Sequence, residues 1–90
     1  MFRVVWAPRT VRDVARIHDY IAAFNPRAAA DLAGRLLEVG DSLAQHPGRG
    51  RPVPGTPWRE LVIVYPYIIR YQITGDVVRI VRVRHGMRLP

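Results

Sequence analysis

Two stretches of helical periodicity joined by one short turn constrain the fold of this chain more than any other feature. In residues 8 to 24 apolar side chains recur at three- and four-residue spacing, and a longer apolar stripe follows Pro26. Asn25 suits the cap of a helix and Pro26 its first turn. Because the connection is so short, the two helices are expected to form an antiparallel hairpin. The apolar positions are Val11, Val14, Ala15, Ile21 and Phe24 in the first helix and Ala29, Leu32, Ala33, Leu36, Leu37, Leu43 and Ala44 in the second.

The segments on either side of the helical hairpin have different signatures. Phe2 to Trp6 is a β-prone run that ends at Ala7-Pro8, and His46-Pro47 ends the second helix. Residues 47 to 57, PGRGRPVPGTP, contain four prolines and three glycines and are expected to form neither helix nor strand. Gly40 is the one break in the second apolar stripe, which predicts that a neighbouring group packs closely there.

The last third of the chain changes to the two-residue period of strands. A β-prone run is followed by a proline turn, an alternating strand, a glycine hairpin and a returning strand. These segments are Arg59 to Val64, Tyr65-Pro66, Tyr67 to Ile73, Gly75-Asp76 and Val77 to Arg84. A two-residue hairpin turn predicts that Ile73 faces Val78, Tyr71 faces Ile80 and Ile69 faces Arg82.

The resulting order is β-α-α-β-β-β, an α+β fold in which a helical hairpin packs on a small antiparallel sheet. The 90 residues suffice for one domain, 1–90, with one core. Trp6 and Trp58 are expected in that core, because each stands at the end of an element. Carboxylates on the helices are expected to be solvated or paired along the helix, as Asp13 is with Arg9.

The balance of charge predicts an acidic partner. The chain has 14 basic residues against 7 acidic ones, a formal net charge of +7, and every basic residue is an arginine. Such a surplus in a small chain points to nucleic acid or to an acidic protein. The N-terminus lacks the apolar stretch of a signal peptide, and no segment approaches the length of a membrane span, so a cytoplasmic location is expected.

Several kinds of catalytic site are excluded by composition. Cysteine is absent, and the histidines at positions 18, 46 and 85 have no metal-ligand spacing. Ser42 is the only serine and lies within a helix, which argues against a serine nucleophile with its triad. The glycine-rich loop lacks the GK[ST] ending of a phosphate-binding loop. Neither a metal nor a cofactor is therefore expected.

The layout and the residues at its joints resemble the RelE/ParE superfamily of toxins from bacterial type II toxin–antitoxin modules. The resemblance extends over nearly the whole chain and rests on three stretches, VVWAPRTVRDVARIHDYIA, HPGRGRPVPGTPWREL and YIIRYQITGDVVRIVRVRHGMR. The closing strand that runs into His85-Gly86-Met87-Arg88 is the most family-like element. The resemblance implies a toxin that is held inactive by a cognate antitoxin, whose acidic, amphipathic C-terminal segment wraps it.

The superfamily has two functional branches. RelE-like members enter the ribosome and cut mRNA, whereas ParE-like members inhibit DNA gyrase and block replication. Metal-free RNA cleavage needs a base, an acid and cations around the scissile phosphate. If the chain is a ribonuclease, the candidate groups are Arg70 and Arg82 for the phosphate, His85 as acid or base and Glu60 as a second base.

Three departures favour the ParE-like branch. The chain has no lysine, and Met87 stands near the place where ribonuclease members tend to have a tyrosine or another titratable group. Ile68 takes the position of a ribonuclease arginine, and Arg70 is displaced from it by two residues. We therefore expect a gyrase inhibitor without enzymatic activity. A ribosome-dependent mRNA endoribonuclease is the alternative, and a nucleic-acid-binding module, indicated by charge alone, is a third possibility.

Arginines are the candidate contacts with a partner. Those near the end of the last strand are expected to form a cationic surface at one edge of the sheet, which would bind the target or the acidic antitoxin segment. Part of the helical apolar stripe is also expected to stay exposed for the antitoxin, since two helices and a small sheet cannot cover every apolar face. The candidate arginines are Arg49, Arg51, Arg70, Arg82, Arg84 and Arg88.

Overall fold

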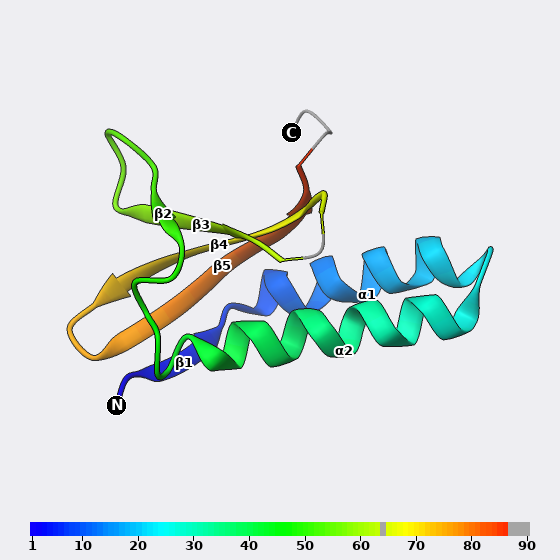
Figure 1. Cartoon of the computed structure of the whole chain (residues 1–90), viewed down its shortest axis with the longest axis horizontal. Coiled ribbons are helices and arrows are strands. Elements are labelled where there is room, and N and C mark those ends of the chain that lie inside the picture. Colours follow the sequence, from blue (N-terminus) through cyan, green and yellow to red (C-terminus); the bar gives the residue numbers. More distant parts are fainter. Residues whose placement is uncertain (64, 87–90) are drawn as a thin grey trace.

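In a computed structural model, which describes residues 1–63 and 65–86, two helices lie side by side against one face of a five-stranded sheet (Figure 1). The elements are β1 (Arg3–Trp6), α1 (Pro8–Ala22), α2 (Pro26–Ser42), β2 (Arg51–Pro52), β3 (Trp58–Val62), β4 (Tyr67–Thr74) and β5 (Val77–His85). The predicted α+β class and the β-α-α-β-β-β order are confirmed, with the short strand β2 added. Within the described ranges, neither helix has the length and apolar character needed to cross a membrane.

The sheet is mixed, which corrects the prediction of an antiparallel one. Its strand order is β1-β5-β4-β3-β2, with β1 parallel to β5 and the other neighbouring pairs antiparallel. Parallel neighbours need a long connection, and here the helical hairpin and the first strands of the meander supply it. The strand β2 also corrects the expectation that residues 47–57 contain no strand. It is an edge strand, where a proline is tolerated.

The helices begin where the sequence predicts. The Asn25 side chain caps α2 by accepting a hydrogen bond from the backbone N–H of Ala28 at 3.0 Å. The first helix ends at Ala22 and not at Phe24, because the backbone N–H groups of Phe24 and Asn25 both turn back to the carbonyl of Ile21. The cap and the tight turn together bring α2 antiparallel to α1 (Figure 1).

The core lies between the helices and the face of the sheet that they cover. Leu36 of α2 and Leu43, which follows that helix, are fully buried against the two long strands. Gly40 allows a close approach, because a Cβ at this position would lie 2.3 Å from the ring of Trp6. The predicted close packing at Gly40 is thereby confirmed, and Trp6 packs at the margin of the core. The fully buried strand residues are Ile69, Tyr71, Val78 and Ile80.

A β-bulge in β5 changes the predicted pairing of the hairpin. The two pairs nearest the turn, Ile73 with Val78 and Tyr71 with Ile80, are confirmed. Farther along, the ladder skips one residue of β5, so Ile69 lies opposite Val83 and not opposite Arg82 as predicted. The bulge therefore keeps a valine, only 2 % exposed, where an unbroken ladder would place an arginine against the core.

Beyond the bulge, the Asp13 side chain of α1, and not a neighbouring strand, accepts a backbone hydrogen bond from β5. The pairing of β1 with β5 ends at Trp6, so the following part of β5 extends past its neighbour. The Asp13 carboxylate accepts a hydrogen bond from the backbone N–H of Val83 at 3.0 Å and lies 3.6 Å from the Nε of Arg82. Only 8 % of Asp13 is exposed and its ion-pair partner is Arg82, so the prediction that it is solvated or paired with Arg9 is wrong. The contact anchors α1 to the sheet.

Candidate functional site

The face of the sheet that the helices leave uncovered, here called the open face, carries most of the strand arginines. Successive side chains of a strand alternate between faces, and directly paired residues on antiparallel neighbours share a face. One row across the sheet pairs Arg51 of β2 with Glu60 of β3, and Glu60 with Arg70 of β4. By register the open-face arginines are Arg3, Arg51, Arg70, Arg79, Arg82 and Arg84, although the Nε of Arg82 lies 3.6 Å from the carboxylate of Asp13 in α1.

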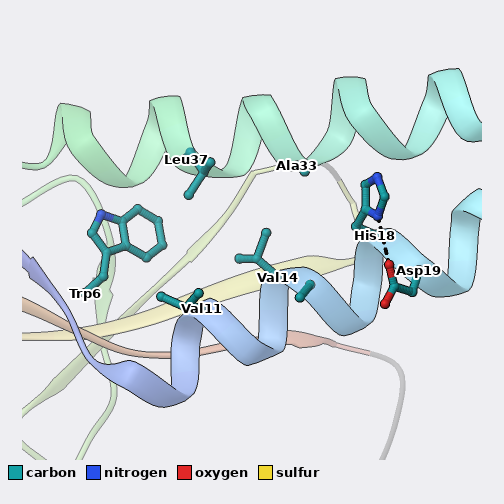
Figure 2. A pocket seen from close by; sticks show the side chains of 8 residues that line it. Trp6, Val11, Val14, His18, Asp19, Ala33 and Leu37 are labelled. Carbon is teal, nitrogen blue, oxygen red and sulfur yellow. Dashed lines mark hydrogen bonds and ion pairs between the residues drawn. The ribbon is translucent and has the colours of Figure 1, made fainter.

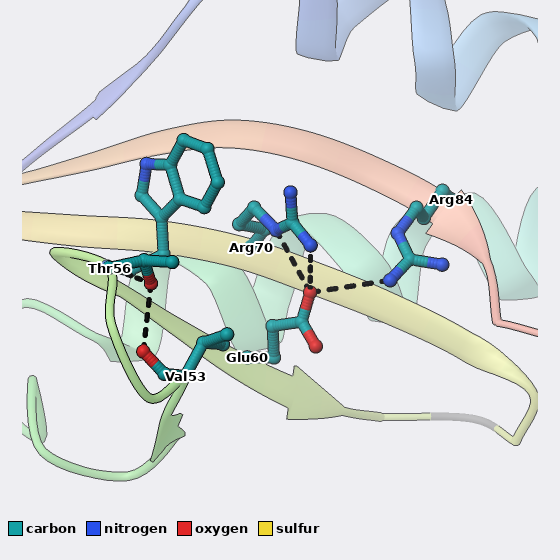
Figure 3. Close-up of polar contacts among 6 residues, drawn as sticks. Val53, Thr56, Glu60, Arg70 and Arg84 are labelled. Atoms are coloured by element: carbon teal, nitrogen blue, oxygen red, sulfur yellow. Dashed lines mark hydrogen bonds and ion pairs between the residues drawn. The ribbon is translucent and has the colours of Figure 1, made fainter. Parts of the chain in front are cut away.

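Glu60 holds two of these arginines together (Figure 3). Its Oε2 lies 2.9 Å from Nε and 2.7 Å from Nη2 of Arg70, and 3.3 Å from Nη2 of Arg84. The side chains are 22 % to 26 % exposed, so partial burial strengthens these charge-assisted hydrogen bonds. Sequence reasoning gave Glu60 only the role of a second base, whereas the structure makes it the centre of the polar cluster.

Arg70 is held from another side by Trp58. Its guanidinium carbon lies 4.6 Å from the centre of the Trp58 ring, a distance typical of a cation–π interaction. Trp58 pairs with Gln72, one row away from Glu60 and on the same face. The prediction that Trp58 belongs to the core is therefore wrong, because its half-buried ring packs with Arg70 on the open face.

The arginines predicted at the end of the sheet do not form one patch of free charges. Arg84 shares Glu60 with Arg70, whereas Arg82 lies against Asp13, and its buried Nε has no hydrogen-bond partner among the described residues. Arg88 lies outside the described residues. A partner would have to compete with the two carboxylates of the domain itself, so a role of these arginines in partner binding stays a prediction.

Arg49 and Arg51, the two arginines of the loop before β3, point to different parts of the molecule because of the way in which the loop is anchored. The buried Tyr71 hydroxyl donates to the carbonyl of Pro47 at 2.7 Å and accepts from the backbone N–H of Gly50 at 2.8 Å. Arg49 lies near the end of α2, where its Nη1 donates to the hydroxyl of Ser42 at 3.3 Å. Arg51 instead enters β2, so it alone of the two joins the open face.

The candidate acid or base, His85, lies on the other side of the sheet. It pairs with Tyr67 in the ladder, and the two rings meet edge to face with their centres 5.3 Å apart. Because Tyr67 packs against the core, this pair occupies the face that the helices cover. Glu60 and Arg70 belong to the open face. The structure thus brings Glu60 and Arg70 together and separates both from His85.

A second surface is an apolar groove between the helices, with a volume of about 510 Å³ (Figure 2). In this groove Val11 of α1 and Leu37 of α2 are 62 % and 46 % exposed, although both are large and apolar. The prediction that part of the helical apolar stripe stays exposed is confirmed. The lining residues are Trp6, Val11, Val14, Ala15, His18, Asp19, Ala33 and Leu37.

Two features of the site escaped sequence reasoning, although one of them left a signal. Glu60 is the only acidic residue in the strands of the described chain, and it alternates with Trp58 in the segment WRELV. Pairing that segment with β4 in the correct register would have placed Glu60 opposite Arg70. The contact of Asp13 with β5 has no such local signal, because it joins residues 70 positions apart.

Comparison with known proteins defines the class of this chain. Residues 4–90 match the family described as the ParE toxin of the type II toxin–antitoxin system parDE. The chain therefore belongs to the ParE toxin family and is a toxin of a type II toxin–antitoxin system. Membership in such a system implies a cognate antitoxin as its partner.

The family match and the similar curated proteins carry names from different branches of the superfamily. Toxin RelE2 of Caulobacter vibrioides is 49 % identical over 89 residues, which cover 99 % of this chain and 100 % of that protein. Toxin RelE1 of the same organism is 41 % identical over 90 residues, covering 96 % and 95 %. A solved structure titled as the chromosomal ParDE system from P. aeruginosa has a TM-score of 0.83, with 94 % and 96 % of the two chains covered. Its sequence identity is 21 %, so this likeness shows the fold.

Proposed function

We propose that this toxin inhibits DNA gyrase without cleaving RNA, acts in the cytoplasm and is held inactive by its cognate antitoxin. The match to the ParE family supports this branch. The observation that carries the proposal is the position of His85 across the sheet from Glu60 and Arg70.

The separation matters because metal-free RNA cleavage requires an acid, a base and cations around one phosphate. Each group must lie within hydrogen-bond reach of the atom that it serves. Here the candidate groups are divided between two faces of one sheet. Arg70 also has a carboxylate at 2.7 Å, and the chain has no lysine to replace it at a phosphate. The open face is better suited to hold a protein surface through its arginines and Trp58.

The apolar groove between α1 and α2 supports the expected antitoxin partner. An amphipathic antitoxin segment would cover Val11 and Leu37, which are otherwise exposed to water. The net charge of +7 would attract the acidic residues of the same segment and accelerate association. We therefore place the apolar part of the antitoxin in this groove.

A supercoiling assay tests the proposed target. Purified gyrase is given relaxed plasmid and ATP, and the toxin is titrated from below to above the enzyme concentration. The expected result is a progressive loss of supercoiling that prior addition of the cognate antitoxin prevents. Heat-denatured toxin is the matched control, and an effect no larger than that of the control would contradict gyrase inhibition.

A ribosome-dependent endoribonuclease is the second candidate. Relatives that are 49 % and 41 % identical are named RelE toxins, and Glu60 and Arg70 place a base beside a cation on the open face. Mapping mRNA 5′ ends in a translating extract tests this candidate. Cuts at fixed codon positions that disappear with Glu60→Gln would establish it, and their absence with the wild-type toxin would remove it.

A further inference from the structure

Glu60 has a setting that no other acidic residue of the described chain shares. It stands on the open face, to which the register assigns six arginines, whereas the remaining carboxylates belong to the helices or, for Asp76, to the turn between β4 and β5. Arg51, Arg70 and Arg84 are its neighbours in the ladder or in space. The carboxylate is therefore the single negative charge in the middle of a cationic face.

The Glu60 carboxylate lies between two guanidinium groups, which are side chains that can also bind phosphate. One oxygen, Oε2, lies within 3.3 Å of donors from both Arg70 and Arg84 (Figure 3). Guanidinium groups use the same donors for a carboxylate as for a phosphate. Because Glu60 belongs to the sheet itself, it competes with an external anion at a high effective concentration.

We propose that Glu60 is an internal counter-ion that sets the partner preference of the open face by lowering its affinity for RNA and DNA backbones. A chain with a net charge of +7 would otherwise be retained by nucleic acid, which binds basic surfaces regardless of sequence. With Glu60 in place, a phosphate must displace a carboxylate before it reaches Arg70 or Arg84. The inference goes beyond the choice of target, because nucleic-acid affinity is measured with neither gyrase nor ribosome present.

An ion pair that served folding alone would behave differently. Breaking it would lower thermal stability, and nucleic-acid affinity would follow the net charge of the protein wherever the charge was removed. The proposal predicts instead that the position of the removed charge decides the effect. It further predicts that the gain in affinity requires the guanidinium groups of Arg70 and Arg84.

Fluorescence anisotropy with a labelled oligouridine RNA measures this preference. Full-length wild-type protein and the Glu60→Gln variant are titrated against the RNA at several NaCl concentrations. Because the substitution frees arginines for phosphate contact, we expect affinity to rise by at least about fivefold near 0.1 M salt. Each added phosphate contact should also steepen the salt dependence of log affinity by about 0.7.

Asp76→Asn is the matched control, since it removes the same charge from the exposed turn and leaves Arg70 and Arg84 paired. We expect this control to stay within about twofold of the wild type. Equal gains for Glu60→Gln and Asp76→Asn would show an effect of net charge alone and overturn the proposal. An unchanged affinity in folded Glu60→Gln, checked by circular dichroism and thermal melting, would overturn it as well. Adding both Arg70→Gln and Arg84→Gln to Glu60→Gln should abolish the gain, and a gain that persists would count against the proposal.

A second variant keeps the proposal testable if Glu60→Gln does not fold. Glu60→Asp retains the charge but withdraws the carboxylate by one methylene from Arg70 and Arg84. It should bind RNA more tightly than the wild type at equal net charge. Equal or weaker binding would overturn the proposal.

Discussion

The two faces of the sheet are built from the same strands but are governed by different forces. On the helix-covered face the central side chains of β4 and β5 are fully buried, so shape and volume decide stability there. On the open face about a quarter of the surface of Glu60, Arg70 and Arg84 is exposed, and we propose that charge there selects the partner. The simple alternation of a strand thus lets one element serve stability and recognition separately. Substitutions at adjacent positions should separate the two roles.

The largest expected contrast is between Ile80→Ala and Arg79→Ala, neighbours on β5. Ile80 is fully buried, and its truncation should lower the free energy of unfolding by roughly 2–5 kcal/mol through lost burial and a cavity. Arg79 is exposed, and its truncation should change that energy by no more than about 0.5 kcal/mol. Urea unfolding followed by tryptophan fluorescence measures both. Similar losses would show that the faces do not divide stability in this way.

Asp13→Ala tests whether a polar contact matters on the covered side. It leaves the N–H of Val83 and the buried Nε of Arg82 without the carboxylate, which should cost about 1–3 kcal/mol of unfolding free energy. Asp13→Asn should cost less, because the amide oxygen still accepts a hydrogen bond. Asp31→Ala, at an exposed position of α2, is the control. An equal change in unfolding free energy for Asp13→Ala and Asp31→Ala would show that Asp13 does not anchor α1 to the sheet.

Tyr71→Phe is expected to have the smallest effect and a local one. The ring stays in the core, but the loop loses a donor to Pro47 and an acceptor for Gly50, at a cost of about 1 kcal/mol. Hydrogen exchange should report faster exchange of the Gly50 amide, with little change at amides of the helices. An unchanged Gly50 rate would show that the hydroxyl does not hold the loop.

The fold was largely predictable because its determinants are local. The Asn25-Pro26 turn and the apolar stripes of the helices predict the hairpin, and the alternation around Tyr71 predicts the covered face of β4. The bulge that moves Val83 opposite Ile69 was not predictable. Its benefit is the burial of a valine in place of an arginine, which arises only when the core is assembled. The parallel pairing of β1 with β5 was likewise not predictable from local sequence, because these strands lie near opposite ends of the chain.

The candidate site was less predictable than the fold. Sequence reasoning assigned Arg70, Arg82 and Arg84 to strands, where the structure has them, but each of these arginines finds its partner through tertiary structure. Arg70 meets Glu60 from another strand, and Arg82 meets Asp13 from a helix. His85 follows Arg84 directly in sequence and faces the other side of the sheet, because neighbours in a strand alternate. The sequence therefore suggested that His85 acts together with Arg70 and Glu60, whereas the fold places His85 on the opposite face of the sheet.

Growth arrest by paired variants tests most directly whether the open face, rather than chemistry at His85, makes this protein a toxin. The account predicts that His85→Ala still arrests growth when expressed without antitoxin, whereas the double variant Arg51→Ala/Arg79→Ala does not. Arg27→Ala/Arg35→Ala removes the same charge from exposed positions of α2 and should remain toxic. Loss of toxicity in folded His85→Ala, with full toxicity in Arg51→Ala/Arg79→Ala, would contradict the account.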